Sequence, residues 1–207
     1  MFNLNLKNKF YLLIVSFFLL NGCGTDNSTK PTVIKGEESL FLNLNSEEQE
    51  TLSILSTNQQ ELLDAINKER AKSRTCGSRG IFPSVPALTW NPELYSAALE
   101  HVTDLAYSNT FSHDGSGTEY DLTGNGKPSK FYERIVANGY SNYYSVGENI
   151  AGGQRSVEEV MKAWMASPGH CENIMKNTYT EVGVAIIIKE DSTYQTYWGQ
   201  NFGSKKR

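Results

Sequence analysis

Basic clusters, cysteine and histidine are scarce in this chain. Its 207 residues include three cysteines and three histidines, and the 23 acidic side chains outnumber the 19 Lys and Arg. The only run of three basic residues is 205–207, at the C-terminus. Because proteins bind nucleic acid through basic patches that neutralise phosphates, we expect no nucleic-acid partner.

The signature motifs of common enzymes are absent as well. The sequence contains no GxSxG, no HExxH and no glycine-rich loop that could cradle a phosphate. These absences argue against the commonest hydrolase and nucleotide-binding chemistries. The composition, with 39% hydrophobic and 20% charged residues, is that of an ordinary globular protein, and one folded domain is expected.

The one long apolar run, FYLLIVSFFLL, lies within residues 1–22 and follows Lys7 and Lys9. It is too short to span a bilayer and is typical of a secretory signal peptide. The run ends in LNGC, which resembles the lipobox of bacterial lipoproteins. We therefore predict that Cys23 is lipidated and anchors the exported protein to the membrane, at the outer membrane or cell surface. An ordinary signal peptide followed by a chance cysteine is the alternative.

The rest of the chain divides into a tether and a domain. Residues 23–57 are expected to form the lipidated N-terminus and a flexible tether, and residues 58–207 the folded part. Capping residues and helical spacing of apolar side chains predict helices over residues 58–73, 91–109, 128–140 and 157–167. Segments rich in β-branched and aromatic residues predict a terminal β-hairpin over residues 181–203. The fold class is therefore α+β, with about four helices around a small antiparallel sheet.

Three polar residues fall where elements end. His113 follows the long helix, Glu148 lies in the triplet GEN, and His170 lies in the first turn of a further helix. Spacing alone does not show that they converge. The surrounding motifs are FSHD, VGEN, WMASPGHCENIM, EVGVA and WGQNFG. Together they resemble the bacterial branch of the CAP superfamily, the cysteine-rich secretory, antigen 5 and pathogenesis-related proteins that share the SCP domain.

This resemblance implies an α-β-α sandwich with a shallow cavity lined by two histidines and usually two glutamates. The histidines correspond to His113 and His170 and one glutamate to Glu148, while Ser167 stands where many members carry the second glutamate. Gln200 is a further candidate for the cavity. Two neutral imidazoles, one carboxylate and water would suit a weakly bound divalent cation such as zinc. A hydrogen-bonded cluster without metal is the alternative.

The two cysteines left after lipidation, Cys76 and Cys171, are expected to form a disulfide in an exported protein. A helix N-terminus also favours a thiolate, so a nucleophilic Cys171 is the competing interpretation. A disulfide would fix the start of the helix that carries His170.

Two other candidates receive structural interpretations. His101, with Asp104 three residues later, has the spacing of metal ligands but lies on the apolar stripe of its helix, so we expect a histidine of the core or its boundary. The segment that begins at Asp121 starts like a calcium loop, but Thr123 and Tyr132 stand where such a loop needs acidic ligands.

The function expected from these observations is that of a membrane-anchored, non-enzymatic module that binds an extracytoplasmic lipid, glycan or protein. The missing second glutamate and the lack of a nucleophile support this expectation. A metal-dependent hydrolase or peptidase that uses the same cavity is the alternative, and a purely adhesive role is a third.

Overall fold

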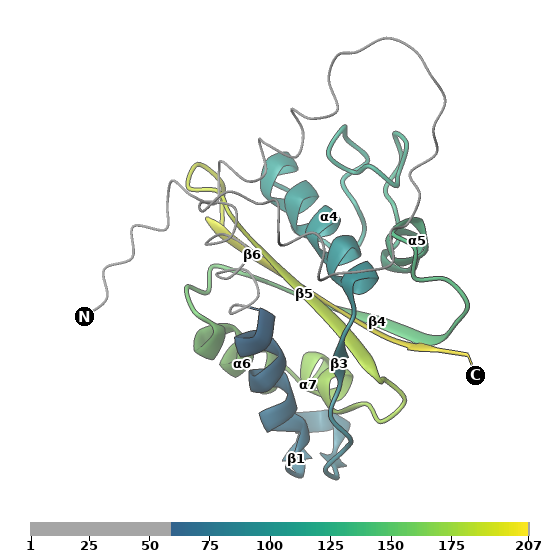
Figure 1. Cartoon of the computed structure of the whole chain (residues 1–207). Coiled ribbons are helices and arrows are strands. Elements are labelled where there is room, and N and C mark those ends of the chain that lie inside the picture. Colours follow the sequence, from purple (N-terminus) through teal and green to yellow (C-terminus); the bar gives the residue numbers. More distant parts are fainter. Residues whose placement is uncertain (1–58, 207) are drawn as a thin grey trace, which may run out of the picture. The chain divides into compact units, whose positions relative to one another are not determined.

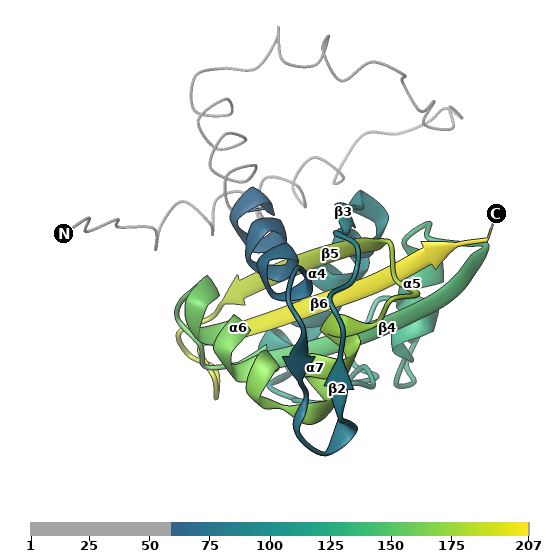
Figure 2. The same cartoon turned by 90° about the horizontal axis from the view of Figure 1, so that it is seen from below.

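The computed structural model describes residues 59–206, which form a mixed β-sheet covered by helices on both faces (Figure 1). The strands lie in the spatial order β3 (Thr89–Trp90), β5 (Glu181–Ile188), β6 (Thr196–Lys205), β4 (Tyr143–Gly152). One face carries α4 (Pro92–Ser108) and α5 (Phe131–Ala137). The other face carries the helix over residues 59–70, α6 (Val157–Ala166) and α7 (Pro168–Met175), as Figure 2 shows. These three layers confirm the predicted α+β sandwich.

Helix α4 begins where the sequence predicts. The side chain of Asn91 accepts hydrogen bonds from the backbone N–H groups of Glu93 and Leu94 at 2.9 and 3.0 Å, and Pro92 occupies the first helical position. The predicted apolar stripe is buried throughout: Leu94, Ala97, Ala98, His101, Val102, Leu105 and Ala106. Through this stripe α4 packs on β5 and β6.

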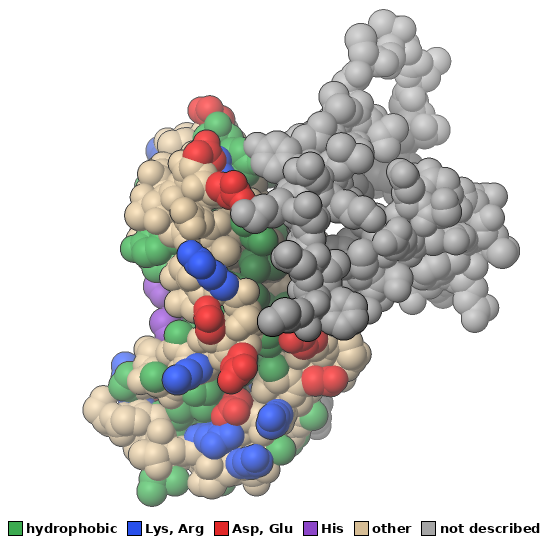
Figure 3. Space-filling view, turned by 90° about the vertical axis from the view of Figure 1, so that its left-hand side faces the viewer, with side chains coloured by type: hydrophobic (Ala, Val, Ile, Leu, Met, Phe, Trp, Pro, Cys, Tyr) green, Lys and Arg blue, Asp and Glu red, His purple; other side chains and the backbone are tan. Residues whose placement is uncertain are grey.

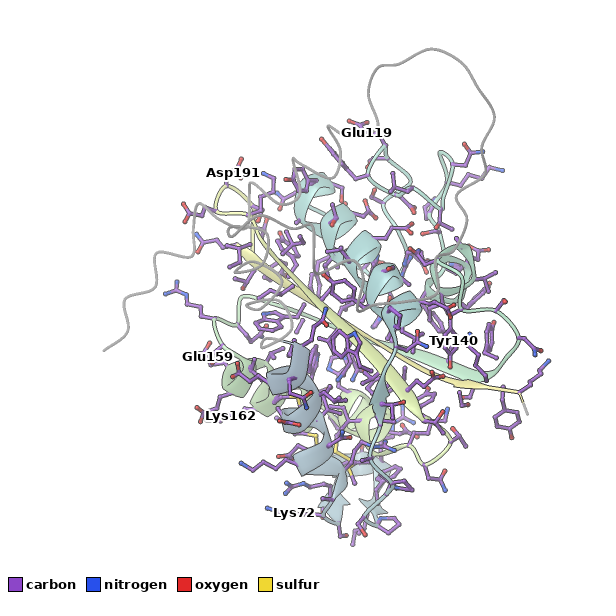
Figure 4. The ribbon with its side chains drawn as sticks, in the orientation of Figure 1. Lys72, Glu119, Tyr140, Glu159, Lys162 and Asp191 are labelled. Atoms are coloured by element: carbon purple, nitrogen blue, oxygen red, sulfur yellow. A yellow bond between two sulfur atoms is a disulfide. The ribbon has the colours of Figure 1, made fainter. Side chains whose placement is uncertain are left out.

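Helix α6 follows the same rules. The Ser156 hydroxyl oxygen accepts a hydrogen bond from the backbone N–H of Glu159 at 3.1 Å. Ser156 is therefore the N-cap of α6. Val160, Met161 and Trp164 are buried. Glu159 and Lys162 point away from the sheet (Figure 4). The helix therefore has one apolar face toward the core and one charged face toward solvent.

The predicted hairpin is present, but the sheet is larger than predicted and is not purely antiparallel. β5 and β6 pair antiparallel, and β4 adds antiparallel to the other edge of β6. The strand β4 was missed because the polar triplet GEN interrupts its apolar pattern. β3 pairs parallel with β5 over only two residues. A further small sheet, β1 (Arg74–Thr75) and β2 (Ile81–Phe82), lies between the first described helix and β3.

Two glycines allow α4 to lie close to the sheet. A Cβ atom at Gly183 would lie 2.0 Å from the backbone nitrogen of Tyr95, and one at Gly199 would lie 2.7 Å from a methyl carbon of Val102. The neighbouring residue Val182 faces the other way and belongs to the core beneath α6 and α7, because successive side chains of a strand point to opposite faces.

The outer edge of β4 is closed by side chains rather than by another strand. Its backbone oxygens at Val146, Glu148 and Ile150 accept hydrogen bonds from Tyr179 Oη, Asn173 Nδ2 and Trp164 Nε1, at 3.2, 3.1 and 3.3 Å respectively. An edge strand with paired carbonyls is a poor template for another chain.

The disulfide between Cys76 and Cys171 is present, as predicted, with the Cα atoms 5.4 Å apart and both residues buried. It joins the segment before the 3-10 helix η2 (Gly77–Arg79) to the first half of α7. The buried guanidinium of Arg70 holds the other end of α7, because it donates to the backbone oxygens of Ile174 and Lys176 at 2.6 and 3.0 Å. Burial lowers the pKa of Arg70 to about 10. Both ends of α7 are thus fixed to neighbouring segments.

The predicted signal peptide over residues 1–22, lipidation of Cys23 and the tether up to residue 57 lie outside the described residues. Among the helices within residues 59–206, none has the length and hydropathy needed to cross a bilayer.

We expect Gly183→Ala to destabilise the fold by about 3 kcal/mol, near the upper end of overpacking effects, because the added methyl group meets the backbone of α4. Urea unfolding measures the loss. Gly169→Ala is the matched control, because a Cβ atom there meets nothing within 4 Å. Equal losses for the two variants would contradict the close approach of α4.

We expect the double variant Cys76→Ser, Cys171→Ser to lose up to about 4 to 5 kcal/mol of unfolding free energy, because the crosslink closes a loop with a sequence separation of 95 residues. Guanidinium unfolding without reductant compares the variant with the wild type. A loss below about 1 kcal/mol would show that the crosslink adds little to stability.

Candidate functional site

The predicted residues His113 and Glu148 are in direct contact. His113 lies in the loop after α4, and its Nδ1 atom is 2.8 Å from Oε1 of Glu148, in the middle of β4. The His113 side chain is 53% exposed, whereas that of Glu148 is only 2% exposed. The carboxylate therefore forms the floor of the site, and the imidazole above it reaches solvent.

Arg134 of α5 binds the other side of the carboxylate. Its Nη2 atom donates to Oε2 of Glu148 and to the backbone oxygen of His113, both at 2.9 Å. Its Nη1 atom donates to the backbone and hydroxyl oxygens of Ser129, both at 3.0 Å. The Arg134 side chain is 1% exposed, so this is a buried ion pair of the kind that requires additional hydrogen bonds. Both oxygens of Glu148 are thus engaged.

The charged groups in this cluster change one another's pKa values. Burial alone would raise the pKa of Glu148, but the hydrogen bond from His113 and the charges of His101 and Arg134 lower it overall. The hydrogen bond to Glu148 raises the pKa of His113 above its usual value. The carboxylate therefore stays ionised, and it favours the protonated ring of His113.

The half-buried ring of His170 lies close enough to His113 to be affected by its charge. Burial, and then the positive charge of His113, lower the pKa of His170. The histidine side chains that reach the surface lie next to each other on one flank of the molecule (Figure 3). One imidazole is therefore favoured in its charged form and its neighbour in its neutral form.

A network of buried and part-buried amides positions His170 through its backbone. Asn149 donates to the backbone oxygen of His170 at 3.2 Å and to Oε1 of Gln200 at 2.9 Å. Asn173 donates to Oδ1 of Asn149 at 3.0 Å. Gln200, a predicted candidate for the cavity, is fully buried in this network and does not line the hollow described next.

A hollow of about 240 Å³ opens beside His170. Ser167 lines this hollow. It occupies the position at which the resemblance implies a glutamate in many members of the family. The rings of Phe111 and Tyr194, 4.8 Å apart, lie opposite and give the hollow an aromatic wall. Glu148 and His113 do not line this hollow. The three predicted residues therefore do not share one cavity: His113 and Glu148 form a hydrogen-bonded pair, and His170 lines a separate hollow.

The predicted metal set of His113, His170 and Glu148 does not fit this geometry. Across residues 59–206 no group of three His, Cys, Asp or Glu side chains is placed so that it could hold a metal ion. The physical reason is that Glu148 is buried and uses both oxygens to bind Arg134 and His113. A cation at this carboxylate would also meet the positive charge of the guanidinium. Glu148 therefore holds the ring of His113 by a hydrogen bond and is not placed as a metal ligand.

Two other residues from the sequence analysis have structural roles. His101 is fully buried, and its Nε2–H donates to the backbone oxygen of Ser112 at 2.9 Å, which confirms the expected core histidine. Asp121 accepts hydrogen bonds from the backbone N–H groups of Gly117, Gly124 and Ser129 at 3.1, 3.1 and 2.9 Å. It thereby organises the long loop that leads to α5.

Arg134 was missed by the sequence analysis. It lies in a short amphipathic helix, where an arginine is ordinarily a surface residue. The available signal was indirect, because a glutamate buried in a strand requires a cationic partner.

We expect Glu148→Gln to bring the pKa of His113 below its present raised value, because the amide carries no negative charge. Titration of the imidazole protons by NMR measures this shift. The variant also leaves Arg134 buried without a counter-ion, so we expect a loss of about 3 to 5 kcal/mol in unfolding free energy. Glu158→Gln, on the exposed face of α6, is the control and should change neither quantity.

The stabilising effect of this pair should depend on pH. The raised pKa of His113 gives stability that is complete below its unfolded value of about 6.5 and is lost as the pH rises through the folded value. The lowered pKa of Glu148 gives stability that is complete above about 4.3 and is lost as the pH falls through the folded value. The stability difference between wild type and Glu148→Gln should therefore be largest between about pH 4.3 and 6.5. A flat difference over pH 3 to 9 would contradict this assignment.

Comparison with known proteins places these observations in a family. Residues 63–202 match the CAP model, described as the cysteine-rich secretory protein family. The uncharacterized protein YkwD of Bacillus subtilis is 31% identical over 155 residues, which cover 74% of this chain and 49% of the relative. The uncharacterized membrane protein YlbC of the same organism is 25% identical over 149 residues, or 72% of this chain and 35% of the relative. The chain thus spans half or less of the length of these curated relatives.

Solved structures agree on the fold. An extracellular protein of Bacillus anthracis that contains an SCP domain superposes with a TM-score of 0.53 at 25% identity, covering 73% of this chain and 41% of the other. An outer surface protein of Borrelia burgdorferi superposes with a TM-score of 0.52 at 20% identity, covering 76% of this chain and 94% of the other. Because the family model matches more than half of the sequence and the three layers match these structures, the chain belongs to the CAP, or cysteine-rich secretory protein, family.

Proposed function

We propose that this protein is an exported, lipid-anchored CAP-domain protein whose site around His113, Glu148 and His170 binds an extracytoplasmic ligand or partner without catalysing its conversion. The N-terminal signal and Cys23 support export and anchoring. Two structural relatives, an extracellular protein of Bacillus anthracis and an outer surface protein of Borrelia burgdorferi, are consistent with this location.

The engaged carboxylate of Glu148 is the observation that carries the non-catalytic part of the proposal. A general base must reach the proton that it abstracts, either directly or through one water. Glu148 is 2% exposed, and its oxygens bind Arg134 and His113. Ser167 occupies the position of the second glutamate that the resemblance implies, and a serine hydroxyl cannot replace a carboxylate. The side chains at the surface are therefore suited to hydrogen bonding and packing.

The alternative function, a metal-dependent hydrolase or peptidase, is not favoured by this geometry. Such enzymes hold zinc through three protein ligands and keep one open position for water. Within residues 59–206 no such group of three is present. His113 and His170 could contribute two imidazoles at most.

Calorimetric titration of zinc into the mature protein separates the two functions. We expect that the wild type binds no zinc at micromolar affinity through His113 and His170. Tyr132→Ala, an exposed tyrosine on α5, is the control for the substitutions His113→Ala and His170→Ala. Micromolar binding that both histidine variants abolish and the control retains would contradict the proposal.

The anchor has its own test. We expect the wild type to incorporate radioactive palmitate and to remain with the membrane fraction. Cys23→Ser should abolish both properties, because the acyl chains that hold the protein are attached to that residue. Cys76→Ser serves as the control, since that cysteine belongs to the disulfide. Unlabelled wild type would exclude the lipid anchor.

A further inference from the structure

Two Asn–Gly pairs lie in the part of the chain that the structure describes. Asn125 and Gly126 belong to the long loop before α5, and Asn138 and Gly139 follow the end of that helix. An Asn–Gly sequence can rearrange without an enzyme, because glycine has no Cβ atom to shield its backbone nitrogen from the side-chain amide of the preceding residue. In a folded protein the reaction depends on how firmly the pair is held, and the two pairs differ in this respect.

The first pair forms the tip of a tight turn. The φ angle is 48° at Asn125 and 83° at Gly126, and the backbone N–H of Lys127 donates to the backbone oxygen of Gly124 at 3.0 Å. Two central residues with positive φ are typical of a type I′ turn, for which Asn–Gly is a preferred sequence. Both residues are exposed. The pair is therefore presented to solvent.

The two groups that would react are not engaged at this tip. Within residues 59–206 the side-chain amide of Asn125 forms no hydrogen bond, and the backbone N–H of Gly126 has no acceptor. Attack by this nitrogen requires rotation about the backbone bond between the two residues. A Cβ atom at Gly126 would meet nothing within 4 Å, so the tip has room for that rotation.

The segment on the N-terminal side of the tip is fixed, and so is the end of the loop. The backbone N–H of Thr123 donates to Oε1 of Glu100 at 2.9 Å, and that of Gly124 donates to Oδ1 of Asp121 at 3.1 Å. The hydroxyl group of Ser129 donates to the same oxygen of Asp121 at 2.6 Å. Rotation at the tip therefore does not require the loop to unfold.

The second pair is held at both reacting groups. Nδ2 of Asn138 donates to Oε2 of Glu100 at 2.6 Å and to the backbone oxygen of Arg134 at 2.9 Å. The backbone N–H of Gly139 donates to the backbone oxygen of Val136 at 3.0 Å. The same attack at this pair would have to break these hydrogen bonds, so the chain contains its own control with an identical dipeptide.

From this contrast we propose that Asn125 is a site of spontaneous deamidation in the folded protein. The backbone nitrogen of Gly126 loses its proton to hydroxide and attacks the side-chain carbonyl carbon of Asn125, and the amide nitrogen leaves as ammonia. The product is a succinimide ring, which water opens at either carbonyl to give aspartate or isoaspartate. In net terms the chain loses ammonia and gains water, and the loop tip acquires a negative charge.

The isoaspartate product also changes the backbone. Its main chain runs through the side-chain carbons of the former Asn125 and is longer by one methylene group. The turn closed by Gly124 and Lys127 cannot keep its geometry with this addition. The modified tip is separate from the site around His113, so this proposal and the proposed function do not depend on each other.

Peptide mapping by mass spectrometry of the full mature protein, stored folded in detergent at mildly alkaline pH, tests the proposal. We expect Asn125 to convert at least tenfold faster than Asn138. In urea the two rates should become similar, because unfolding removes the hydrogen bonds that protect Asn138. Methyl transfer by protein isoaspartyl methyltransferase identifies the isoaspartate product, and the rate should rise with pH because the attacking nitrogen must lose its proton.

Gly126→Ala adds a variant with a shielded nitrogen. It should slow conversion of Asn125 at least tenfold and leave the rate at Asn138 unchanged, while the melting temperature shows that the variant is folded. The proposal is overturned if Asn125 in the folded protein converts no faster than Asn138, or if it stays intact over a period in which the unfolded chain converts.

Discussion

The buried ion pair between Arg134 and Glu148 is the interaction on which the geometry of the site depends. It joins α5 to the middle of β4, and the same guanidinium also holds the backbone oxygen of His113. The carboxylate in turn binds the ring of His113 from below. A single arginine therefore fixes both the main chain and, through Glu148, the side chain of the exposed histidine. Such a pair favours one arrangement because separating the buried charges leaves each of them without a partner.

The edge strand β4 explains how two histidines from distant segments come together. Consecutive side chains of a strand point to opposite faces, so Glu148 and Asn149 act on different sides of the sheet. Glu148 contacts His113 on the α4 side, and Asn149 bonds the backbone of His170 in α7 on the other side. The disulfide of Cys171, the part-buried amide of Asn173 and the buried amide of Gln200 fix α7 further. The triplet GEN thus positions both imidazoles at one edge.

Local signals in the sequence predicted most helices and the terminal hairpin, because caps such as Asn91 and Ser156 and the apolar periods act within a few residues. The disulfide could be predicted from the number of cysteines and the expected export. The strand β4 and the role of Arg134 could not be predicted in this way, since a polar strand and a buried arginine make sense only with their tertiary partners. For the same reason the sequence left open whether Glu148 belongs to a weak metal site or to a hydrogen-bonded cluster, and the structure shows it bonded to Arg134 and His113.

A double-mutant cycle on Arg134→Met and Glu148→Leu, measured by urea unfolding, tests the central ion pair most directly. Each single substitution leaves the opposite charge buried without a partner, whereas the double variant removes both charges. The account predicts that the double variant is more stable than either single variant, with a coupling of several kcal/mol, roughly 3. Losses that simply add would show that Arg134 and Glu148 do not act together, and the proposed support of His113 would fail.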